Sequence, residues 1–366
     1  RDGNEPHIEK FAQPVIDALG DRALILGVGT WDKITNRPRV EDLNGYFNRR
    51  WHYPAAVIVR LGVKKADLAK YARVVTMLET LTGFSLDPLR TFPRWMLRIF
   101  FIQKHGYRKI FKRTKAKYVF AVNAARMPLQ AAAQSLGMKV IEIQSGVFSK
   151  YSLQFSWPGS PKIDYIPDEI WTWGDYWTSG IERAGGQSVR VIGSTEEFES
   201  IRERHIPKIA GQVVVLSQPL IGLDILQAAI DFAAARPDLN VIFKLHPRNE
   251  IEEFASYLAG SNSAPANLSL MQFEKSSLEV IAESEISVGV FSTALIEAAG
   301  LGAKVAIIKL PGWEHLAPLI DGGYASAFDN AAELVAGLDA LKNPADEYFF
   351  YGRRANIQSI VDDLLA

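Results

Sequence analysis

The sequence predicts an α/β protein with two Rossmann-like domains that face each other across a cleft. Two observations predict this fold. The chain of 366 residues is too long for one small core, and short apolar strands alternate with helices in two successive series. The composition, 48% hydrophobic and 22% charged, is that of a globular protein. No apolar run is long enough to cross a bilayer.

The first series is expected within an N-terminal domain, residues 1–200. Short apolar runs bounded by turn residues predict strands at 22–29 and 55–61. Beyond them, strands and helices alternate as in a doubly wound layer. The expected strands are 117–122, 139–143, 169–173 and 189–192, and the expected helices are 128–136 and 176–184.

A charged stretch, residues 196–208, is predicted to link this domain to a second one at 201–350. The second domain is expected to carry strands at 212–217, 240–245, 268–271, 286–290 and 304–308, and helices at 223–235, 251–258, 277–282 and 294–301. The remaining segment, 351–366, predicts a helix that could pack back on the N-terminal domain. Two such domains place a ligand between them, at the carboxyl ends of their strands.

Three places in the second half put polar residues where a predicted strand ends. A helix N-terminus beside them would attract an anion through its unpaired N–H groups and its dipole, and a proline biases the residue before it to extended backbone. We therefore predict a phosphate site; the alternatives are that the hydroxyls are only helix caps and that the single histidine is structural. The candidates are Ser217, Lys244, His246, Pro247, Ser292 and Thr293.

Competing motifs are missing from the sequence. There is no phosphate-binding P-loop, no complete Gly-x-Gly-x-x-Gly and no Gly-x-Ser-x-Gly. Cysteine is absent and the six histidines lack metal-ligand spacing. Because Asp-x-Asp is also absent, the sequence does not indicate a metal-held donor. The sequence therefore does not favour a dinucleotide-dependent oxidoreductase or a serine hydrolase, and we expect neither a metal nor another cofactor.

Together these motifs resemble a known family. Lys-Leu-His246-Pro247, followed by Val-Phe-Ser292-Thr293, is similar to the donor domain of two-domain (GT-B) glycosyltransferases. It is closest to bacterial enzymes that use CMP-activated acidic sugars, the sialyl- and Kdo-transferases. The resemblance implies that His246 and the two hydroxyls bind the CMP phosphate. It further implies that Glu297 holds the ribose and that Gly312 borders the base.

The N-terminal half resembles capsule and lipopolysaccharide transferases and CDP-glycerol phosphotransferases, through Ile141-Glu142-Ile-Gln-Ser145-Gly. Ser145 stands where those families carry histidine. Transfer to a hydroxyl calls for a carboxylate that takes its proton. We choose Glu142, at the end of its strand, as the catalytic base, with a structural carboxylate as the alternative. The reserves are Asp164, Asp168 and Asp175.

The zero net charge hides a strongly basic segment. Residues 88–118 contain ten Lys or Arg and no Asp or Glu, with seven aromatic residues between them. Such a surface attracts anionic headgroups while aromatic rings seat in the interface. We predict docking to a membrane or a lipid-linked acceptor; a solvated basic helix is the alternative. The candidates are Arg94, Trp95, Arg98, Arg108, Lys109, Lys112 and Arg113.

The sequence therefore predicts a transferase that moves a Kdo-like or sialic-acid-like sugar from a CMP donor to a bacterial surface glycan. We expect it in the cytoplasm, bound peripherally to the inner face of the membrane, with no nucleic-acid partner. Two enzymatic alternatives stay open: a CDP-glycerol-type phosphotransferase, or a transferase of UDP- or GDP-sugars. A catalytically silent GT-B module that binds glycans or acts as a scaffold is the non-enzymatic alternative.

Overall fold

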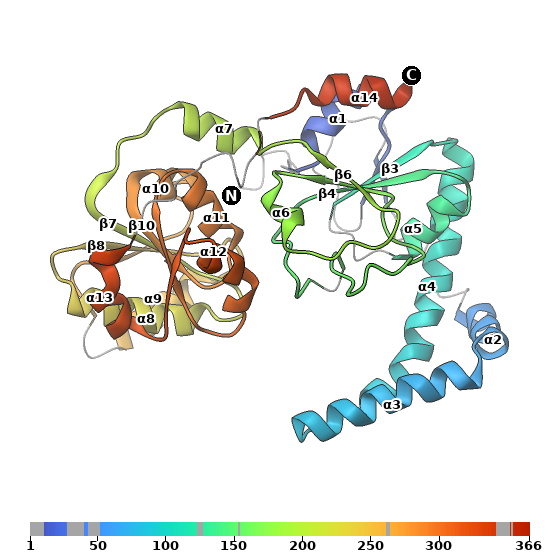
Figure 1. The fold of residues 1–366 in the computed structure, drawn as a ribbon, viewed down its shortest axis with the longest axis horizontal. Helices are drawn as coiled ribbons and strands as arrows, with labels where there is room; N and C mark the ends of the chain where they lie inside the picture. The colour runs from blue at the N-terminus through green and yellow to red at the C-terminus, as the bar shows by residue number, and fades with distance from the viewer. Residues whose placement is uncertain are drawn as a thin grey trace.

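The computed structural model describes residues 11–27, 40–42, 52–122, 127–152, 154–260, 264–341, 352 and 354–366. Two α/β domains stand side by side, and a helical arm projects from the N-terminal one (Figure 1). Each domain contains a parallel sheet, as the sequence predicts. A separate short pair, β1 (Ile25–Gly27) and β2 (Val40–Asp42), is also parallel.

The N-terminal sheet has four parallel strands between two layers of helices. In order they are β3 (Tyr118–Val122), β4 (Lys139–Ile143), β5 (Glu169–Thr172) and β6 (Ser188–Val191). One face packs on α5 (Met127–Gln134) and on the C-terminal part of α4 (Asp87–Thr114). The other packs on α1 (Gln13–Leu19) and α14 (Ile357–Leu365), so the end of the chain completes this domain.

The C-terminal sheet has six parallel strands in the order β12-β11-β10-β7-β8-β9. The strands are β7 (Ile209–Leu216), β8 (Asn240–Lys244), β9 (Leu268–Met271), β10 (Ser284–Gly289), β11 (Lys304–Ile308) and β12 (Ser326–Phe328). The helices are α8 (Gly222–Ala235), α9 (Ile251–Gly260), α10 (Ser277–Glu283), α11 (Thr293–Gly300), α12 (Ala317–Asp321) and α13 (Ala331–Gly337).

Local sequence explains where several of these helices begin. Ser276 accepts from the backbone N–H of Glu279, whose carboxylate accepts from the N–H of Ser276 in return, which makes a capping box for α10. Asn330 caps α13 in the same position. These side chains satisfy N–H groups that have no partner inside the helix.

One sequence prediction is wrong in this structure. The expected strand at 55–61 is helix α2 (His52–Gly62), in which Ala55 and Val59 are buried while Val57 and Ile58 are exposed. Burial at a spacing of four residues is helical, and so short an apolar run fits either element. The expected linker contains α7 (Glu196–Glu203), which Thr195 caps.

The two domains share one hydrophobic core. Trp173 and Trp177, from the end of β5 and from α6 (Tyr176–Ser179), belong to the same buried cluster as Leu316 and Leu319 of the C-terminal domain. Trp177 is fully buried. Burial raises the pKa of Tyr176 far above its usual range, and Tyr324 and Asp321 of the other domain add to this shift. The carboxyl end of β5 therefore abuts the C-terminal domain.

Helices α2, α3 (Lys65–Thr82) and α4 make up the projecting arm. Gly83 ends α3 in a left-handed conformation, with φ of 72°. Arg90 then fixes the turn, because its guanidinium donates to Glu79 at 2.5 Å and to Asp87 at 3.2 Å. In the part of the chain that the structure describes, no helix is both long enough and apolar enough to cross a membrane.

Candidate active site

The strand order of the C-terminal sheet locates a crevice. Successive strands run outward from β7 through β8 to β9, and then restart from β10 on the other side of β7. Such a switch point is where open parallel sheets bind ligands, at the carboxyl ends of the strands. Gln218 follows β7, and its Oε1 accepts the backbone N–H of Phe291, which follows β10, at 3.2 Å. One hydrogen bond thus spans the crevice.

Asn249 organises one wall of this crevice. Its Oδ1 accepts from the Ser217 hydroxyl at 3.0 Å and from the backbone N–H of His246 at 3.1 Å. Both Ser217 and His246 are predicted phosphate ligands, so the structure brings them together through a third residue. Ser217 is 5% exposed, whereas His246 is half-buried and Pro247 beside it is exposed.

The imidazole of His246 has a defined role for each nitrogen. Its Nδ1 accepts the backbone N–H of Arg248 at 3.1 Å, which places the ring proton of the neutral form on Nε2. Burial lowers the pKa of His246, and the positive charge of Arg248 lowers it further. The neutral ring is therefore a hydrogen-bond donor through Nε2 at neutral pH.

Lys244 is positioned differently from its prediction. It is 4% exposed, and its ammonium donates to the backbone carbonyls of Lys275, at 2.7 Å, and Gln272. Burial lowers the pKa of Lys244, partly offset by the charge of Glu274. These contacts make Lys244 a brace between β8 and the chain after β9.

The hydroxyl pair lies at the start of α11. Ser292 is the N-cap, and its Oγ accepts the N–H of Ala294 at 3.2 Å. Thr293 is the first helical residue and is half-buried. Glu297, one turn on, is 8% exposed. The first turn of α11 therefore presents its positive end at the mouth of the crevice, while Ser292 also has the capping role that the sequence left as an alternative.

A contact between the domains closes one side of the site. His315 lies in the short 3-10 helix Trp313–Leu316, and its Nδ1 is 3.0 Å from the hydroxyl of Ser149, which follows β4 in the other domain. The ring of Phe291 lies 6.2 Å from that of His315. Gly312 has φ of 99°, and a Cβ there would come within 2.6 Å of Phe291, so glycine is required beside the crevice.

The loop after β4 in the N-terminal domain is held by Gln144. Its Oε1 accepts the N–H of Trp173 at 2.9 Å, and its Nε2 donates to the carbonyl of Gly146 at 3.0 Å. Ser145 is half-buried within this loop. Gln144 therefore shapes the turn that carries Ser149 to His315.

The four carboxylates proposed as bases occupy different environments. Glu142 is 1% exposed, on the face of β4 that Val140 packs against α5. Asp168 lies at the opposite edge of the sheet, where it accepts the N–H of Val140 at 2.8 Å. Asp164 is exposed in the loop before β5, and Asp175 is exposed just beyond the carboxyl end of β5. Asp175 is the one that combines exposure with the edge where β5 meets the other domain.

The seven basic or aromatic docking candidates all lie on α4. Arg94, Trp95 and Arg98 are in its projecting half and are exposed, as are Lys109, Lys112 and Arg113 nearer the sheet. Arg108 is half-buried and donates to Ser135, through the carbonyl at 3.3 Å and through the hydroxyl. The docking candidates thus do not share a surface with the crevice residues of the other domain.

Sequence reasoning did not single out Gln218, Asn249 or His315. Each has a signal in hindsight: Gln218 adjoins Ser217, and Asn249 is three residues after His246, a spacing at which an amide reaches back to a backbone N–H. His315 follows the glycine at 312 by one turn. No pattern in the sequence joins it to Ser149, because that contact crosses between domains.

No known family model matches the sequence, and no curated protein matches it either. Solved structures do match its fold. The UDP-GlcNAc 2-epimerase of Methanocaldococcus jannaschii is 11% identical with a TM-score of 0.56, over 97% of this chain and 96% of that one. The epimerase of Neisseria meningitidis, bound to UDP-GlcNAc, is 14% identical with a TM-score of 0.54 over the same shares.

A glycotransferase of kitacinnamycin is also similar, at 14% identity and a TM-score of 0.50, over 73% of this chain and 81% of that one. At these identities the likeness concerns the fold. The chain therefore has the GT-B arrangement of two Rossmann-like domains.

Proposed function

We propose that the protein is a glycosyltransferase that moves a sugar from a nucleoside-diphosphate donor, a UDP-sugar in the first instance, to a glycan acceptor. The observation that carries this proposal is the crevice at the switch point of the C-terminal sheet. Gln218 and Phe291 span it, and His246 stands at its wall. The N-terminal domain closes one side of it through Ser149.

The donor phosphates fit the positive end of α11. Leaving of the nucleotide places negative charge on its phosphate, and preorganised donors stabilise that charge. The Nε2–H of His246 supplies one such donor, and the first turn of α11 with Thr293 supplies others. Because the sequence carries no Asp-x-Asp, the proposed transfer uses no metal ion.

The acceptor hydroxyl needs a base, and exposure favours Asp175 over Glu142. A base must lie within hydrogen-bond reach of the proton that it takes. Glu142 is 1% exposed, whereas Asp175 is open to solvent beside α6. We keep both carboxylates in the proposal, as the two variants described below separate them.

The sequence motifs and the structural likenesses support different donors. His246-Pro247 and Ser292-Thr293 resemble the transferases of CMP-linked Kdo or sialic acid, whereas the structural relatives with the larger overlap are described with UDP-GlcNAc. We rank the UDP-sugar first because those likenesses extend over 97% of the chain. For the acceptor we propose a surface or lipid-linked glycan at the cytoplasmic face of a membrane, which the basic arm supports.

Epimerisation is the second candidate function. Two of the similar solved structures, each overlapping 97% of the chain, are UDP-GlcNAc 2-epimerases. Incubation with UDP-GlcNAc and NMR of the sugar separate the two activities. A transferase with an acceptor releases UDP and forms a glycoside, whereas an epimerase changes the configuration at C2 of the sugar.

Thermal-shift measurements with CMP, CDP, UDP and GDP test the donor class. We expect the largest stabilisation with UDP. His246→Ala should weaken nucleotide binding about ten- to a hundredfold, the loss of one hydrogen bond to a charged group. His205→Ala is the matched control, since this histidine is exposed on the linker between the domains. Selective stabilisation by CMP would support a donor of the CMP-linked acidic-sugar class. Stabilisation by none of the four nucleotides would support a catalytically silent module that binds glycans.

Turnover of Asp175→Asn and Glu142→Gln tests the base. We expect Asp175→Asn to keep the thermal shift with nucleotide and to lose about 10²- to 10⁴-fold in rate, the usual contribution of a general base. Glu142→Gln should keep most of its rate. The opposite pattern, at an unchanged melting temperature, would assign the base to Glu142.

A further inference from the structure

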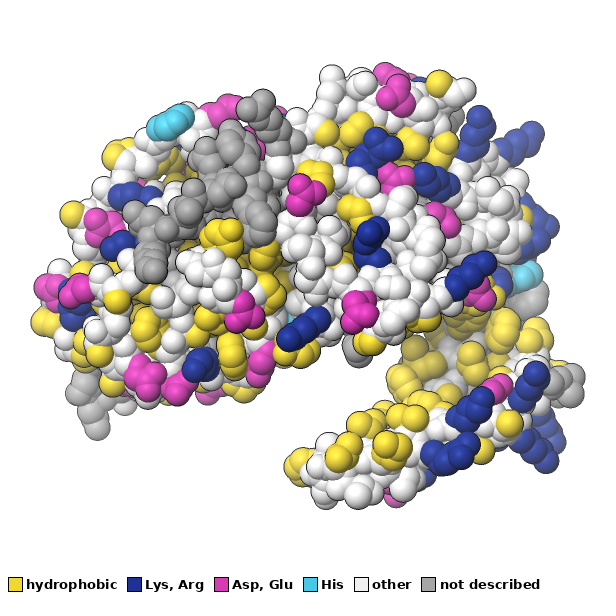
Figure 2. Space-filling view, in the orientation of Figure 1, with side chains coloured by type: hydrophobic (Ala, Val, Ile, Leu, Met, Phe, Trp, Pro, Cys, Tyr) yellow, Lys and Arg dark blue, Asp and Glu magenta, His cyan; other side chains and the backbone are white. Residues whose placement is uncertain are grey.

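The arm carries most of the apolar side chains that the described part of the chain leaves in solvent. Ten of the 17 exposed large hydrophobic residues lie on it, although it is a small part of the protein. Figure 2 shows hydrophobic side chains along α3 and on the side of the arm that faces the two domains, and Lys and Arg toward the end of the arm at which α2 lies. The ten are Val57, Ile58, Val74, Met77, Leu78, Leu81, Phe84, Phe92, Trp95 and Met96.

Helix α3 presents one continuous apolar stripe. Val74, Met77 and Leu78 are followed by Leu81, at spacings of three and four residues that place all of them on one face. Leu81 is 78% exposed. Val75, which does not belong to the stripe, is buried, and α3 contacts α4. The stripe is therefore not the face that holds the arm together.

One face of helix α4 is buried against the N-terminal domain in its C-terminal part and exposed to solvent in its projecting part. Ile110 is fully buried against the N-terminal sheet. About four turns earlier on the same face, Met96 is 43% exposed and Trp95, beside it, is 55% exposed. Arg94 and Arg98 flank this surface and line the same hollow as Trp95. The projecting half thus continues an apolar surface whose other half packs against α5.

The charge of the arm is strongly positive. Residues 52–114 contain 13 Lys or Arg side chains and 3 Asp or Glu. A hollow on α4 combines both chemistries, because its lining includes Phe92 and Trp95 together with Arg94 and Arg98. A partner must therefore offer hydrocarbon to the stripe and negative charge to its flanks. A second copy of this chain offers the same positive arm, which repels it.

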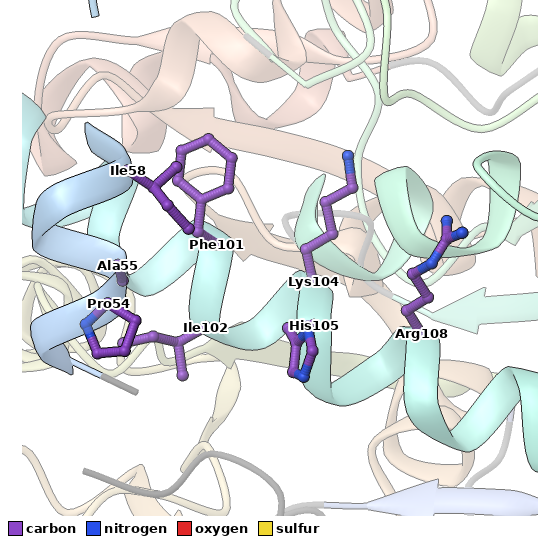
Figure 3. A pocket seen from close by; sticks show the side chains of 8 residues that line it. All are labelled: Pro54, Ala55, Ile58, Phe101, Ile102, Lys104, His105 and Arg108. Atoms are coloured by element: carbon purple, nitrogen blue, oxygen red, sulfur yellow. The ribbon is translucent and has the colours of Figure 1, made fainter. Parts of the chain in front are cut away.

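The root of the arm contains a further hydrocarbon surface. A cavity of about 220 Å³ lies between α2 and α4. Figure 3 shows Pro54, Ala55 and Ile58 facing Phe101 and Ile102 across it. Lys104, His105 and Arg108 line its other end, where the side chains of Lys104 and Arg108 extend away from α2 and Arg108 is engaged with Ser135. The cavity accordingly suits an apolar chain rather than a phosphate.

We infer that the arm lies in the plane of an anionic phospholipid bilayer, with the α3 stripe and the uncovered half of α4 among the acyl chains. Arg94 and Arg98 then reach the headgroups from the flanks, as long basic side chains do at interfaces. Each basic residue near such a surface contributes about 1 kcal/mol, and apolar insertion adds to it. This inference deepens the proposed membrane location of the acceptor and does not depend on the donor.

Vesicle flotation with the full chain tests the inference. We expect the protein to float with phosphatidylcholine vesicles that contain phosphatidylglycerol, and to bind about tenfold less to phosphatidylcholine alone or at high salt. The double variant L81E/W95E should lose about tenfold or more in binding. Leu220→Glu is the matched control, because Leu220 is 90% exposed on the other domain, and it should bind as the wild type does. R94E/R98E should lose binding without touching the apolar stripe.

Equal binding to neutral and anionic vesicles, or wild-type binding by L81E/W95E, would overturn the inference. So would light scattering that shows a dimer which L81E/W95E dissociates, without any vesicle binding, because a second copy would then cover the arm. The thermal shift with nucleotide serves as the folding control for each variant. It also separates a failure of this inference from a failure of the proposed function, since the crevice and the arm belong to different domains.

Discussion

Lys244 and His246 are two residues apart, and their surroundings give them separate tasks. The ammonium of Lys244 is fixed on backbone carbonyls below the site, whereas the imidazole of His246 is half-buried at its wall. Glu169 shows the same principle in the other domain. Burial raises its pKa, but hydrogen bonds from Lys139, Arg190 and Trp171 outweigh that effect and hold the pKa below its usual value. The hydrogen-bond partners of each charged side chain, and not its position in the sequence, determine its role.

Lys208 gives a prediction at this scale, with a dependence on pH. Burial lowers the pKa of Lys208 to about 8, despite the nearby charge of Glu285. The unfolded chain keeps the ordinary, higher pKa, so it binds more protons between these two values, and the free energy of unfolding rises with pH across that window. Below pH 8 the full penalty for the buried charge remains.

Lys208→Met should therefore raise the free energy of unfolding at pH 7 by about 1 kcal/mol, a value reduced for the partial exposure of this side chain. The advantage should shrink as the pH approaches 10. Urea unfolding at pH 7, 8.5 and 9.5 measures it. A stability difference that stays constant with pH would show that the packing of methionine, and not the titration of lysine, causes the change.

At the scale of elements, the sequence predicts the second domain better than the first. Its strands at 240–245 and 304–308 are apolar runs with clear turn residues around them, and they form β8 and β11. The run at 55–61 has the same composition but forms α2, because its partner is a helix of the arm. The hydrogen bonds of the site are harder still to predict from the sequence, since Gln218 and Phe291 are 73 residues apart.

Helix α14 supplies the prediction for this scale. Val361 is 1% exposed and packs with Val15 and Ile143, and the hydroxyl of Tyr118 donates to the carbonyl of Leu364. Val361→Asp would bury a charge against the sheet. We expect it to lower the free energy of unfolding by about 3 kcal/mol or more.

Chemical denaturation measures this loss, and Ser359→Asp is the control on the same helix. Ser359 is exposed in the first turn, where an acidic side chain is neutral or favourable. If both variants lost stability equally, the loss would come from the added charge and not from burial of Val361.

On the scale of the whole molecule, the shared core makes the two domains one thermodynamic unit. Trp177 is fully buried in a cluster that also contains Phe198 of the linker helix and Leu319 of the C-terminal domain. A contact of this kind between domains is apolar and continuous with the interior of each. Unfolding of one domain would expose the core of the other.

We therefore expect calorimetry to show one unfolding transition for the full chain. Trp177→Ala should lower its midpoint and remove about 3–5 kcal/mol of stability, as large-to-small changes at buried tryptophans do. The variant could also split the transition in two, as the domains lose their common core. Two separate transitions in the wild type would contradict the prediction.

The linker helix and the C-terminal segment meet at one place. Arg354 lies 3.3 Å from Glu196 at the start of α7, and Ala355 donates its N–H to the carbonyl of Ile192 at 2.9 Å. The chain thus leaves the N-terminal domain and returns to it at neighbouring points. The two crossings tie the domains together at one side, so the chain adds its own restraint there to that of the shared core.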